Sequence, residues 1–266
     1  MFEAIPEGIR EAVLDRIDAV EKEFAVKVVY ACESGSRAWR FASADSDYDV
    51  RFIYVNRPEW YVSVESLRDV IELPIDGDLD VNGWDLRKAL GLLRKSNPPL
   101  LEWLDSPLVY REVTPIASWM REIVQNHYSS RACWHHYLHM AEGNFRHCLQ
   151  GDEVFRKKHL YVLRPVLAIL WIERGLGVVP TPFQTAVDAV VDDPGVRAAI
   201  DRLLEAKRAG KELDSGPRIP AIAEFLEKEL ERLTNHGGEV VGNNAPRKVL
   251  NKVLREGIST AWRQDA

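Results

Sequence analysis

Apolar residues recur at every third or fourth position in the first part of the chain, and this spacing then gives way to short apolar runs. Between Pro6 and Phe24 the spacing is that of an amphipathic helix. Four later segments, rich in β-branched and other apolar residues, are typical of strands. They are Val26–Ala31, Val50–Val55, Val70–Leu73 and Leu79–Val81. The pattern therefore predicts a helix followed by the strands of one sheet.

The pattern becomes helical after Asp85 and stays helical to the end of the chain. Asp85 directly precedes Leu86–Lys95, in which three leucines share a face, and its carboxylate is a suitable N-cap for that helix. Further predicted helices are Leu100–Leu104, Pro115–Gln125, Trp134–Leu149, Glu153–Arg174, Pro182–Val191, Val196–Ala209, Ile219–Leu233 and Ala245–Arg263. We predict an α+β fold, with a small mixed-sheet module over residues 1–112 and a helical module over residues 113–266.

Composition is that of a globular protein with a substantial core. Of the 266 residues, 46% are hydrophobic and 29% are charged, which fits one large or two small domains. No segment approaches the roughly 20 uninterrupted apolar residues of a membrane-spanning helix. Residues Met1–Arg10 lack a basic segment followed by an apolar run. We therefore expect a cytoplasmic protein without a membrane partner.

Charge and cysteine content argue against further classes of protein. The formal net charge of −6 is unlike that of a protein that coats nucleic acid, although it allows a local basic cleft. Cys32, Cys133 and Cys148 are an odd number without CxxC spacing, which disfavours a disulfide framework or a zinc ribbon. His135 and His139 share a helix face, but no HExxH glutamate lies between them, so a helical surface is the favoured interpretation.

The segment Glu33–Tyr54 carries the strongest chemical signal. A predicted strand runs into a turn of small residues, where Gly35 allows close backbone approach to a phosphate. The hydroxyl of Ser34 or Ser36 can add a donor to the backbone amides that follow. This turn is therefore a candidate triphosphate-binding site.

Two aspartates at the start of the next predicted strand suit a metal ion. Asp47 and Asp49 are two residues apart, so both side chains point to the same face of the strand. Mg²⁺ prefers hard oxygen ligands beside substrate phosphates. A third carboxylate is needed to hold the metal near the nucleophile and to serve as, or orient, a general base. Asp80, flanked by apolar residues, is the first choice, and Asp85 is the reserve.

Several cationic and aromatic side chains are candidates for nucleotide contacts. Arg37 follows the Gly-Ser turn and can donate two hydrogen bonds to a triphosphate. Arg51 alternates onto the strand face of the Asp-x-Asp pair, where neutralising those carboxylates is its other interpretation. Lys158, Tyr161 and Arg164 have helical spacing and share a broad face, and they can equally belong to a packed helix.

The span from Gly35 to Asp49 resembles the Gly-Ser then Asp-x-Asp signature of the DNA polymerase beta superfamily, with ten residues between Ser36 and Asp47. A longer match resembles the predicted nucleotidyltransferases called RNA-ligase-associated, or YcgL-like, and it extends to about Phe183. Its segments are Gly35–Tyr54, Gly83–Leu90, Lys95–Leu104, Ser106–Pro107 and Lys157–Pro165. Two residues depart from the family pattern, since a Gly is expected at Arg40 and a Pro at Ala44.

The resemblance implies a polymerase beta-like catalytic module and roles for its matching residues. Gly35 and Ser36 would hold phosphate, Asp47 and Asp49 would hold Mg²⁺ or Mn²⁺, and Asp80 is assigned as the third acid. The implied reaction transfers a nucleoside monophosphate from a nucleoside triphosphate, such as ATP, and releases pyrophosphate. An RNA end, a protein or a small molecule would be the acceptor.

Two other functions use the same residues. A non-catalytic nucleotide-binding or regulatory partner of an RNA repair or toxin system would keep the fold without turnover, although both aspartates of the Asp-x-Asp pair are present. A nuclease or metal-dependent hydrolase would use the same acids, but such sites rarely need a Gly-Ser phosphate-binding turn.

Overall fold

The chain folds into two compact units, which a computed structural model describes for residues 5–149, 151, 153–209, 215–235 and 240–263. Unit 1 comprises Met1–Ala38, Asp47–Tyr128 and Asn244–Ala266. Unit 2 comprises Trp39–Ser46 and Ser129–Asn243. The short segment Trp39–Ser46, between the Gly-Ser turn and the Asp-x-Asp pair, therefore belongs to a different unit from the residues that flank it.

Unit 1 is built on a mixed sheet of five strands in the order β3-β4-β2-β1-β5. The β2–β4 pair is parallel, and the other neighbouring pairs are antiparallel. The strands are β1 (Lys27–Glu33), β2 (Tyr48–Val55), β3 (Val70–Glu72), β4 (Leu79–Asp85) and β5 (Val109–Glu112). The predicted strands are therefore confirmed, and β5 is an addition. This edge strand has only four residues, which is too few to give a clear apolar pattern.

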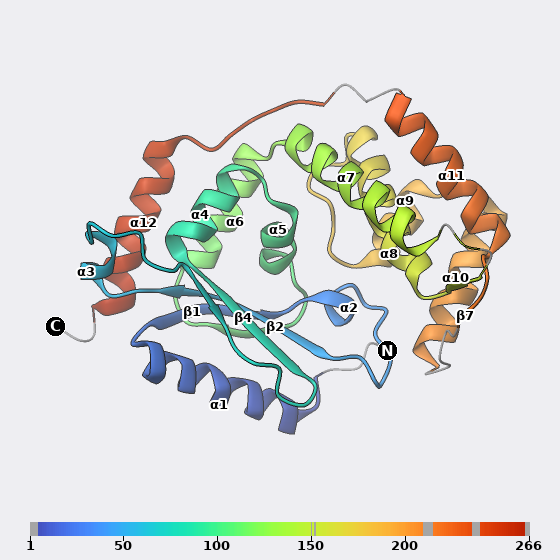
Figure 1. Ribbon diagram of the computed structural model, residues 1–266. Coiled ribbons are helices and arrows are strands. Elements are labelled where there is room, and N and C mark those ends of the chain that lie inside the picture. Colours follow the sequence, from blue (N-terminus) through green and yellow to red (C-terminus); the bar gives the residue numbers. More distant parts are fainter. Residues whose placement is uncertain (1–4, 150, 152, 210–214, 236–239, 264–266) are drawn as a thin grey trace. The chain divides into compact units, whose positions relative to one another are not determined.

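Helices cover both faces of this sheet (Figure 1). The first predicted helix is confirmed as α1 (Glu7–Phe24), which buries Val13, Ile17 and Val20 against one face. On the other face lie α4 (Leu86–Arg94), α5 (Pro98–Leu104), α6 (Ile116–His127) and α12 (Arg247–Trp262). Two short helices, α2 (Gly35–Ala38) and α3 (Pro58–Tyr61), follow β1 and β2.

The limits of unit 1 differ from the module boundary predicted after residue 112. Helix α6 lies beyond that boundary, and α12 lies near the end of the chain, yet both pack in unit 1. The fit of α12 is close, because a Cβ added at Gly257 would lie 2.7 Å from Leu86 Cδ2 and 3.3 Å from Ile116 Cδ1. Sequence spacing identifies both helices but not the core against which they pack. The assignment of residues 1–112 as a separate catalytic module stays a prediction.

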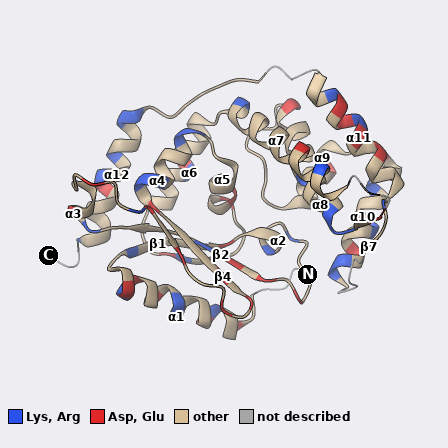
Figure 2. Ribbon diagram, in the orientation of Figure 1, with Lys and Arg blue, Asp and Glu red and all other residues tan. Residues whose placement is uncertain are grey.

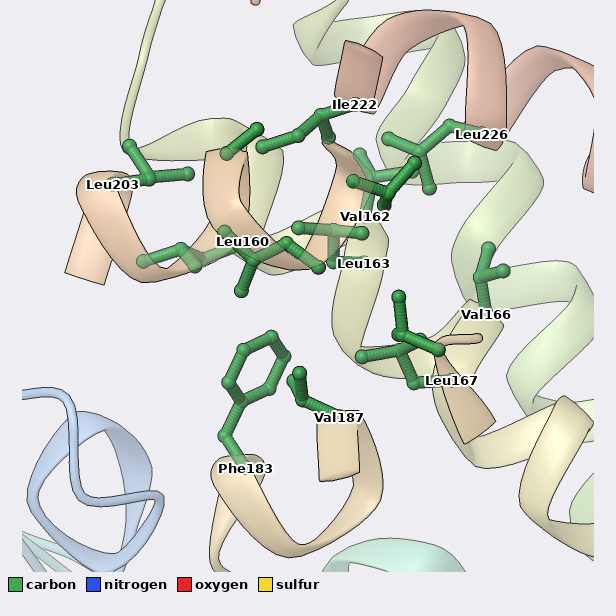
Figure 3. Close-up of a cluster of buried hydrophobic side chains, with 14 of the residues drawn as sticks. Leu160, Val162, Leu163, Val166, Leu167, Phe183, Val187, Leu203, Ile222 and Leu226 are labelled. Atoms are coloured by element: carbon green, nitrogen blue, oxygen red, sulfur yellow. The ribbon is translucent and has the colours of Figure 1, made fainter. Parts of the chain in front are cut away.

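Unit 2 is mainly helical and has its own core. Its elements are α7 (Ser130–Cys148), β6 (Glu153–Phe155), α8 (Lys158–Glu173), α9 (Phe183–Val190), α10 (Pro194–Arg208), β7 (Ser215–Pro217) and α11 (Pro220–Asn235). Figure 3 shows side chains of α8, α9, α10 and α11 meeting in this core. Phe41 is buried in the same cluster, which explains why Trp39–Ser46 belongs to unit 2.

One predicted helix in unit 2 is wrong at its start. Glu153–Arg174 was expected to be helical throughout, but Glu153–Phe155 is a strand that pairs antiparallel with Ser215–Pro217. Helix α8 begins only at Lys158. The short apolar run fits either structure, and the pairing partner is far away in the sequence. Together the two units confirm the α+β fold class with a mixed sheet and a helical part. No helix within the described ranges is long and apolar enough to cross a membrane.

Candidate active site

The parallel pairing of β2 and β4 brings two of the predicted acids side by side. Asp49 on β2 is the register partner of Asp80 on β4. Both side chains are partly exposed, at 30% for Asp49 and 26% for Asp80. Asp47 lies just before β2 and is exposed. The structure thus places Asp49 and Asp80 side by side, and Asp47 is the residue immediately before β2.

Arg51 joins the two neighbouring carboxylates. Its Nη2 lies 2.7 Å from Asp80 Oδ2 and 3.0 Å from Asp49 Oδ1. Its Nη1 donates to the backbone carbonyls of Asp80 at 2.8 Å and Val50 at 3.0 Å. The expectation that Arg51 neutralises acids on its strand face is confirmed for Asp49, and Asp80 of β4 is its second partner.

The pKa of Asp49 reflects these neighbours. Burial raises it above its usual range, and the charges of Asp80 and Asp47 raise it further. The Arg51 guanidinium acts in the opposite direction by stabilising the carboxylate. The Arg51 cation therefore favours the charged form of Asp49, which is the form that binds a metal ion.

Asp85 has a different environment at the far end of β4. It is fully buried and caps α4, where its carboxylate accepts the Arg87 N–H at 2.7 Å. Tyr61 Oη and Asn56 Nδ2 also donate to it, at 2.7 Å and 2.9 Å. The N-cap prediction is confirmed. Asp85 is therefore a buried cap, and Asp80 is the acid that lies beside Asp49. The role of Asp80 as the third acid stays a prediction.

The structure gives two reasons for a glycine at position 35 that the sequence does not show. Its φ of 59° lies in the left-handed region. A Cβ at this position would lie 2.0 Å from Asp49 Oδ2. The turn is also tied to β2, because the Ser34 N–H donates to the Asp49 carbonyl at 2.8 Å. Gly35 therefore leaves room for the Asp49 carboxylate, while its contact with phosphate stays a prediction.

Glu33 is a buried acid behind Asp49 that was not predicted as a site residue. Its Oε1 accepts the backbone N–H of Asp49 at 2.9 Å, and its Oε2 accepts the Tyr110 hydroxyl at 2.5 Å. Burial raises the pKa of Glu33 to about 7, although both hydrogen bonds act to lower it. The signal in the sequence is an acid at the end of an apolar strand, directly before the Ser-Gly-Ser turn.

Arg37 lies close to the start of β2. Its guanidinium carbon is 3.8 Å from the centroid of the Tyr48 ring, and its Nε donates to the Asp47 carbonyl at 3.2 Å. These contacts hold a positive charge beside the Asp-x-Asp pair. Arg37 is therefore placed near the acids, and its contact with a triphosphate stays a prediction.

Lys158, Tyr161 and Arg164 lie together on α8 of unit 2. The Lys158 ammonium is 5.3 Å from the Tyr161 ring centroid, and the Arg164 guanidinium carbon is 4.2 Å from the Trp39 ring centroid. The rings of Trp39 and Tyr161 meet edge to face. Arg164 is buried, as expected if it belongs to a packed helix. The role of these three residues in nucleotide binding stays a prediction.

The donor set of the site fits a hard divalent cation in its chemistry. Asp49 and Asp80 present carboxylate oxygens from adjacent strand positions, and such oxygens are the ligands that Mg²⁺ prefers. Among the described residues, no three His, Cys, Asp or Glu side chains are gathered as a metal site. The guanidinium of Arg51 lies between Asp49 and Asp80 instead. A metal ion at these acids would therefore share them with Arg51.

Arg40 departs from the family pattern in a way that the backbone explains. Its φ is 64°, in the left-handed region where glycine is favoured. The expected Gly would adopt this conformation without strain, whereas an Arg adopts it at a cost of about 1 kcal/mol. Arg40 therefore takes a backbone conformation that the expected Gly would favour.

The mixed sheet, the Gly-Ser turn and the neighbouring acids define a nucleotidyltransferase-like protein. The sequence model of the RNA repair pathway DNA polymerase beta family matches residues 9–256. The chain therefore belongs to this family, which confirms the resemblance noted from the sequence.

Two relatives illustrate the similarity. "Uncharacterized protein YcgL" of Bacillus subtilis (strain 168) is 44% identical over 256 residues, which span 96% of this chain and 98% of that protein. A solved structure described as a nucleotidyltransferase-like protein from Exiguobacterium sibiricum 255-15 is 16% identical, with 95% of this chain and 88% of that chain covered and a TM-score of 0.27.

Proposed function

We propose that this protein is a metal-dependent nucleotidyltransferase, which moves a nucleoside monophosphate from a nucleoside triphosphate to an acceptor. The observation that carries the proposal is the register of Asp49 and Asp80 on parallel strands, beside a turn in which Gly35 makes room for the Asp49 carboxylate. Paired carboxylates next to a small-residue turn suit a divalent ion and a triphosphate. Membership of a DNA polymerase beta family supports the same chemistry.

In the proposed reaction an acceptor oxygen forms a bond to the α-phosphorus of the triphosphate. The bond from that phosphorus to the oxygen of the β-phosphate breaks, and pyrophosphate leaves. The proton of the acceptor hydroxyl passes to the carboxylate of Asp80, which acts as the general base. Mg²⁺ or Mn²⁺, held by Asp47, Asp49 and Asp80, would offset the negative charge on the phosphate oxygens.

The residues around the acids have supporting roles in this scheme. Gly35 and Ser36 hold the triphosphate through the backbone and a hydroxyl, and Arg37 adds a positive charge that is already oriented by Tyr48. Arg51 holds the carboxylates of Asp49 and Asp80 in place through its two short contacts. Each of these side chains belongs to unit 1.

Transfer of a labelled nucleotide tests the proposal. Wild-type protein is incubated with each α-labelled nucleoside triphosphate, Mg²⁺ or Mn²⁺, total cellular RNA and total protein, and label and pyrophosphate are followed together. We expect transfer by the wild type and none by Asp47→Asn/Asp49→Asn. The labelled product then identifies the acceptor as RNA, protein or a small molecule.

The matched control is Asp76→Asn/Asp78→Asn. This pair is also separated by one residue, but it lies in the exposed turn before β4, so transfer should be retained. Nucleotide binding without transfer in the wild type would contradict the proposal and favour a regulatory module. Release of inorganic phosphate without pyrophosphate would indicate a hydrolase instead.

A further inference from the structure

Basic side chains from two helices of unit 2 form a second charged feature of the molecule. Arg156, Lys157 and Lys158 are consecutive at the start of α8, and Lys207 and Arg208 end α10. One cluster of aromatic rings joins the two helix ends: the Lys207 ammonium lies over Phe41 and the Lys158 ammonium over Tyr161, and Trp39 contacts both rings. These five residues are named the basic cluster. Figure 2 colours Lys and Arg blue on the ribbons of both helices.

The cations of the basic cluster have no carboxylate partners among the described residues. None of the ion pairs found in that part of the chain involves any of the five, and the first turn of α8 contains no acid. Arg156, Lys157 and Arg208 are exposed, and Lys158 and Lys207 are half-buried. Cations that repel one another without a neutralising acid favour an anionic ligand.

An exposed aromatic ring lies directly beside these charges in the chain. Phe155 ends strand β6, is 57% exposed, and is followed at once by Arg156. Its backbone is held by the β6–β7 pairing, where it faces Ser215 in register. A large apolar side chain in water next to several cations is the composition of single-stranded nucleic-acid sites, in which bases stack on rings and phosphates meet Lys and Arg.

The same cluster is tied to the segment between the Gly-Ser turn and the Asp-x-Asp pair. Arg208 Nη2 donates to the Arg40 carbonyl at 3.3 Å, and the Lys207 ammonium lies 5.9 Å from the Phe41 ring centroid. Both contacts are within unit 2. The end of α10 is therefore held by residues 40 and 41, which fixes where its two charges are presented.

We propose that the basic cluster and Phe155 bind a single-stranded polynucleotide, with phosphates on Lys157, Lys207 and Arg208 and a base stacked on Phe155. This inference rests on the proposed function in one respect, since the bound strand would be the nucleotide acceptor. An anionic membrane surface is less well matched, because it needs a larger apolar face than one ring. An acidic peptide would use the charges but not the exposed aromatic side chain.

Fluorescence anisotropy with a labelled oligouridylate of about 12 nucleotides tests the inference over a series of salt concentrations. EDTA is present throughout, so that binding is measured without metal-dependent transfer. We expect Lys157→Gln/Lys207→Gln/Arg208→Gln to flatten the slope of log affinity against log salt by about 2, since each phosphate contact on a single strand contributes about 0.7. Lys157→Gln alone should flatten it by about 0.7.

Phe155→Ser should weaken binding at least about fivefold while the salt slope stays the same, because loss of stacking removes no phosphate contact. Phe155→Tyr keeps a ring and should restore the wild-type affinity. The charge control is Arg131→Gln/Arg202→Gln/Lys228→Gln, which removes three exposed cations from α7, α10 and α11 of the same unit. This control should bind as the wild type does.

Four outcomes would overturn the inference. In the first, the triple variant and Phe155→Ser both bind the oligonucleotide with wild-type affinity, and in the second, the charge control loses as much affinity as the triple variant. In the third, ATP at equal phosphate concentration displaces the oligonucleotide. In the fourth, the protein binds phosphatidylserine vesicles in place of the oligonucleotide. Asp47→Asn/Asp49→Asn should still bind the oligonucleotide. Binding without transfer by the wild type would therefore contradict the proposed function alone.

Discussion

Two aspartates, one near each end of β4, have different environments. Asp80, near its start, meets the cation Arg51 at 2.7 Å and is 26% exposed. Asp85, at its end, is fully buried and is surrounded by the neutral donors Tyr61, Asn56 and the Arg87 amide. Arg51 and Asn82 donate to the Asp80 carboxylate, but solvent still reaches it. Asp85 has no exposed surface and caps a helix, so it belongs to the fold. The environment, and not the residue type, distinguishes them.

Alanine at each end tests this contrast most directly and gives the largest expected effects. Asp80→Ala should lower nucleotide transfer at least about 100-fold, the usual scale for loss of a general base. Its free energy of unfolding should change by less than about 1 kcal/mol, because partly exposed ion pairs contribute little. Transfer assays and urea denaturation on the same preparation measure both quantities.

Asp85→Ala should show the opposite result. Loss of the N-cap and of the acceptor for two half-buried donors should lower the free energy of unfolding by about 2–3 kcal/mol. The folded protein should keep transfer close to the wild-type rate when it is assayed well below its denaturation midpoint. A variant at Asp85 that is stable but inactive would reverse the assignment of the third acid.

The sequence predicted the site acids because they lie in short-range patterns. The Asp-x-Asp spacing, the turn before it and the apolar neighbours of Asp80 are all local, and a strand of period two fixes which side chains share a face. It could not predict the register that pairs Asp49 with Asp80, since that depends on strands far apart in the chain. For the same reason Arg51 was expected near the acids of its own strand, and its contact with Asp80 was not foreseen.

Burial and long-range packing explain the other omissions. Glu33 reads as an ordinary strand end until Asp49 and Tyr110 are seen to donate to it. The strand Glu153–Phe155 was included in a helix because its partner lies more than 50 residues away at Ser215–Pro217. The return of α12 to unit 1 has no local signal at all.

Glu33 is a third buried or half-buried acid to compare with Asp80 and Asp85, and its protonation changes near neutral pH. The unfolded chain loses this proton near the ordinary value of 4.5, whereas the folded protein keeps it until about pH 7. Between these two values the folded state holds the additional proton, so the free energy of unfolding should fall as the pH rises, by about 3 kcal/mol in total, and then level off. Urea denaturation of the wild type at intervals from pH 4.5 to pH 8 measures the trend.

Glu33→Gln is the matched control for that trend, because its amide is neutral at every pH. The difference between wild type and variant should shrink or change sign as the pH rises, while contributions from Asp49 and Asp85 are common to both proteins. A difference that stays constant over this range would show that Glu33 is already charged in the folded protein at acidic pH.

Gly35→Ala tests the turn that adjoins the Asp49 carboxylate. A non-glycine residue at a φ of 59° should cost about 1 kcal/mol. The added methyl group would also displace the Asp49 carboxylate, because its position lies 2.0 Å from Oδ2. Transfer should therefore fall more than stability does. Gly91→Ala on α4 is the control, since no atom lies within 4 Å of its added Cβ, and it should keep full activity with equal or higher stability. If Gly35→Ala keeps wild-type transfer, the position of the Asp49 carboxylate is not what the turn protects.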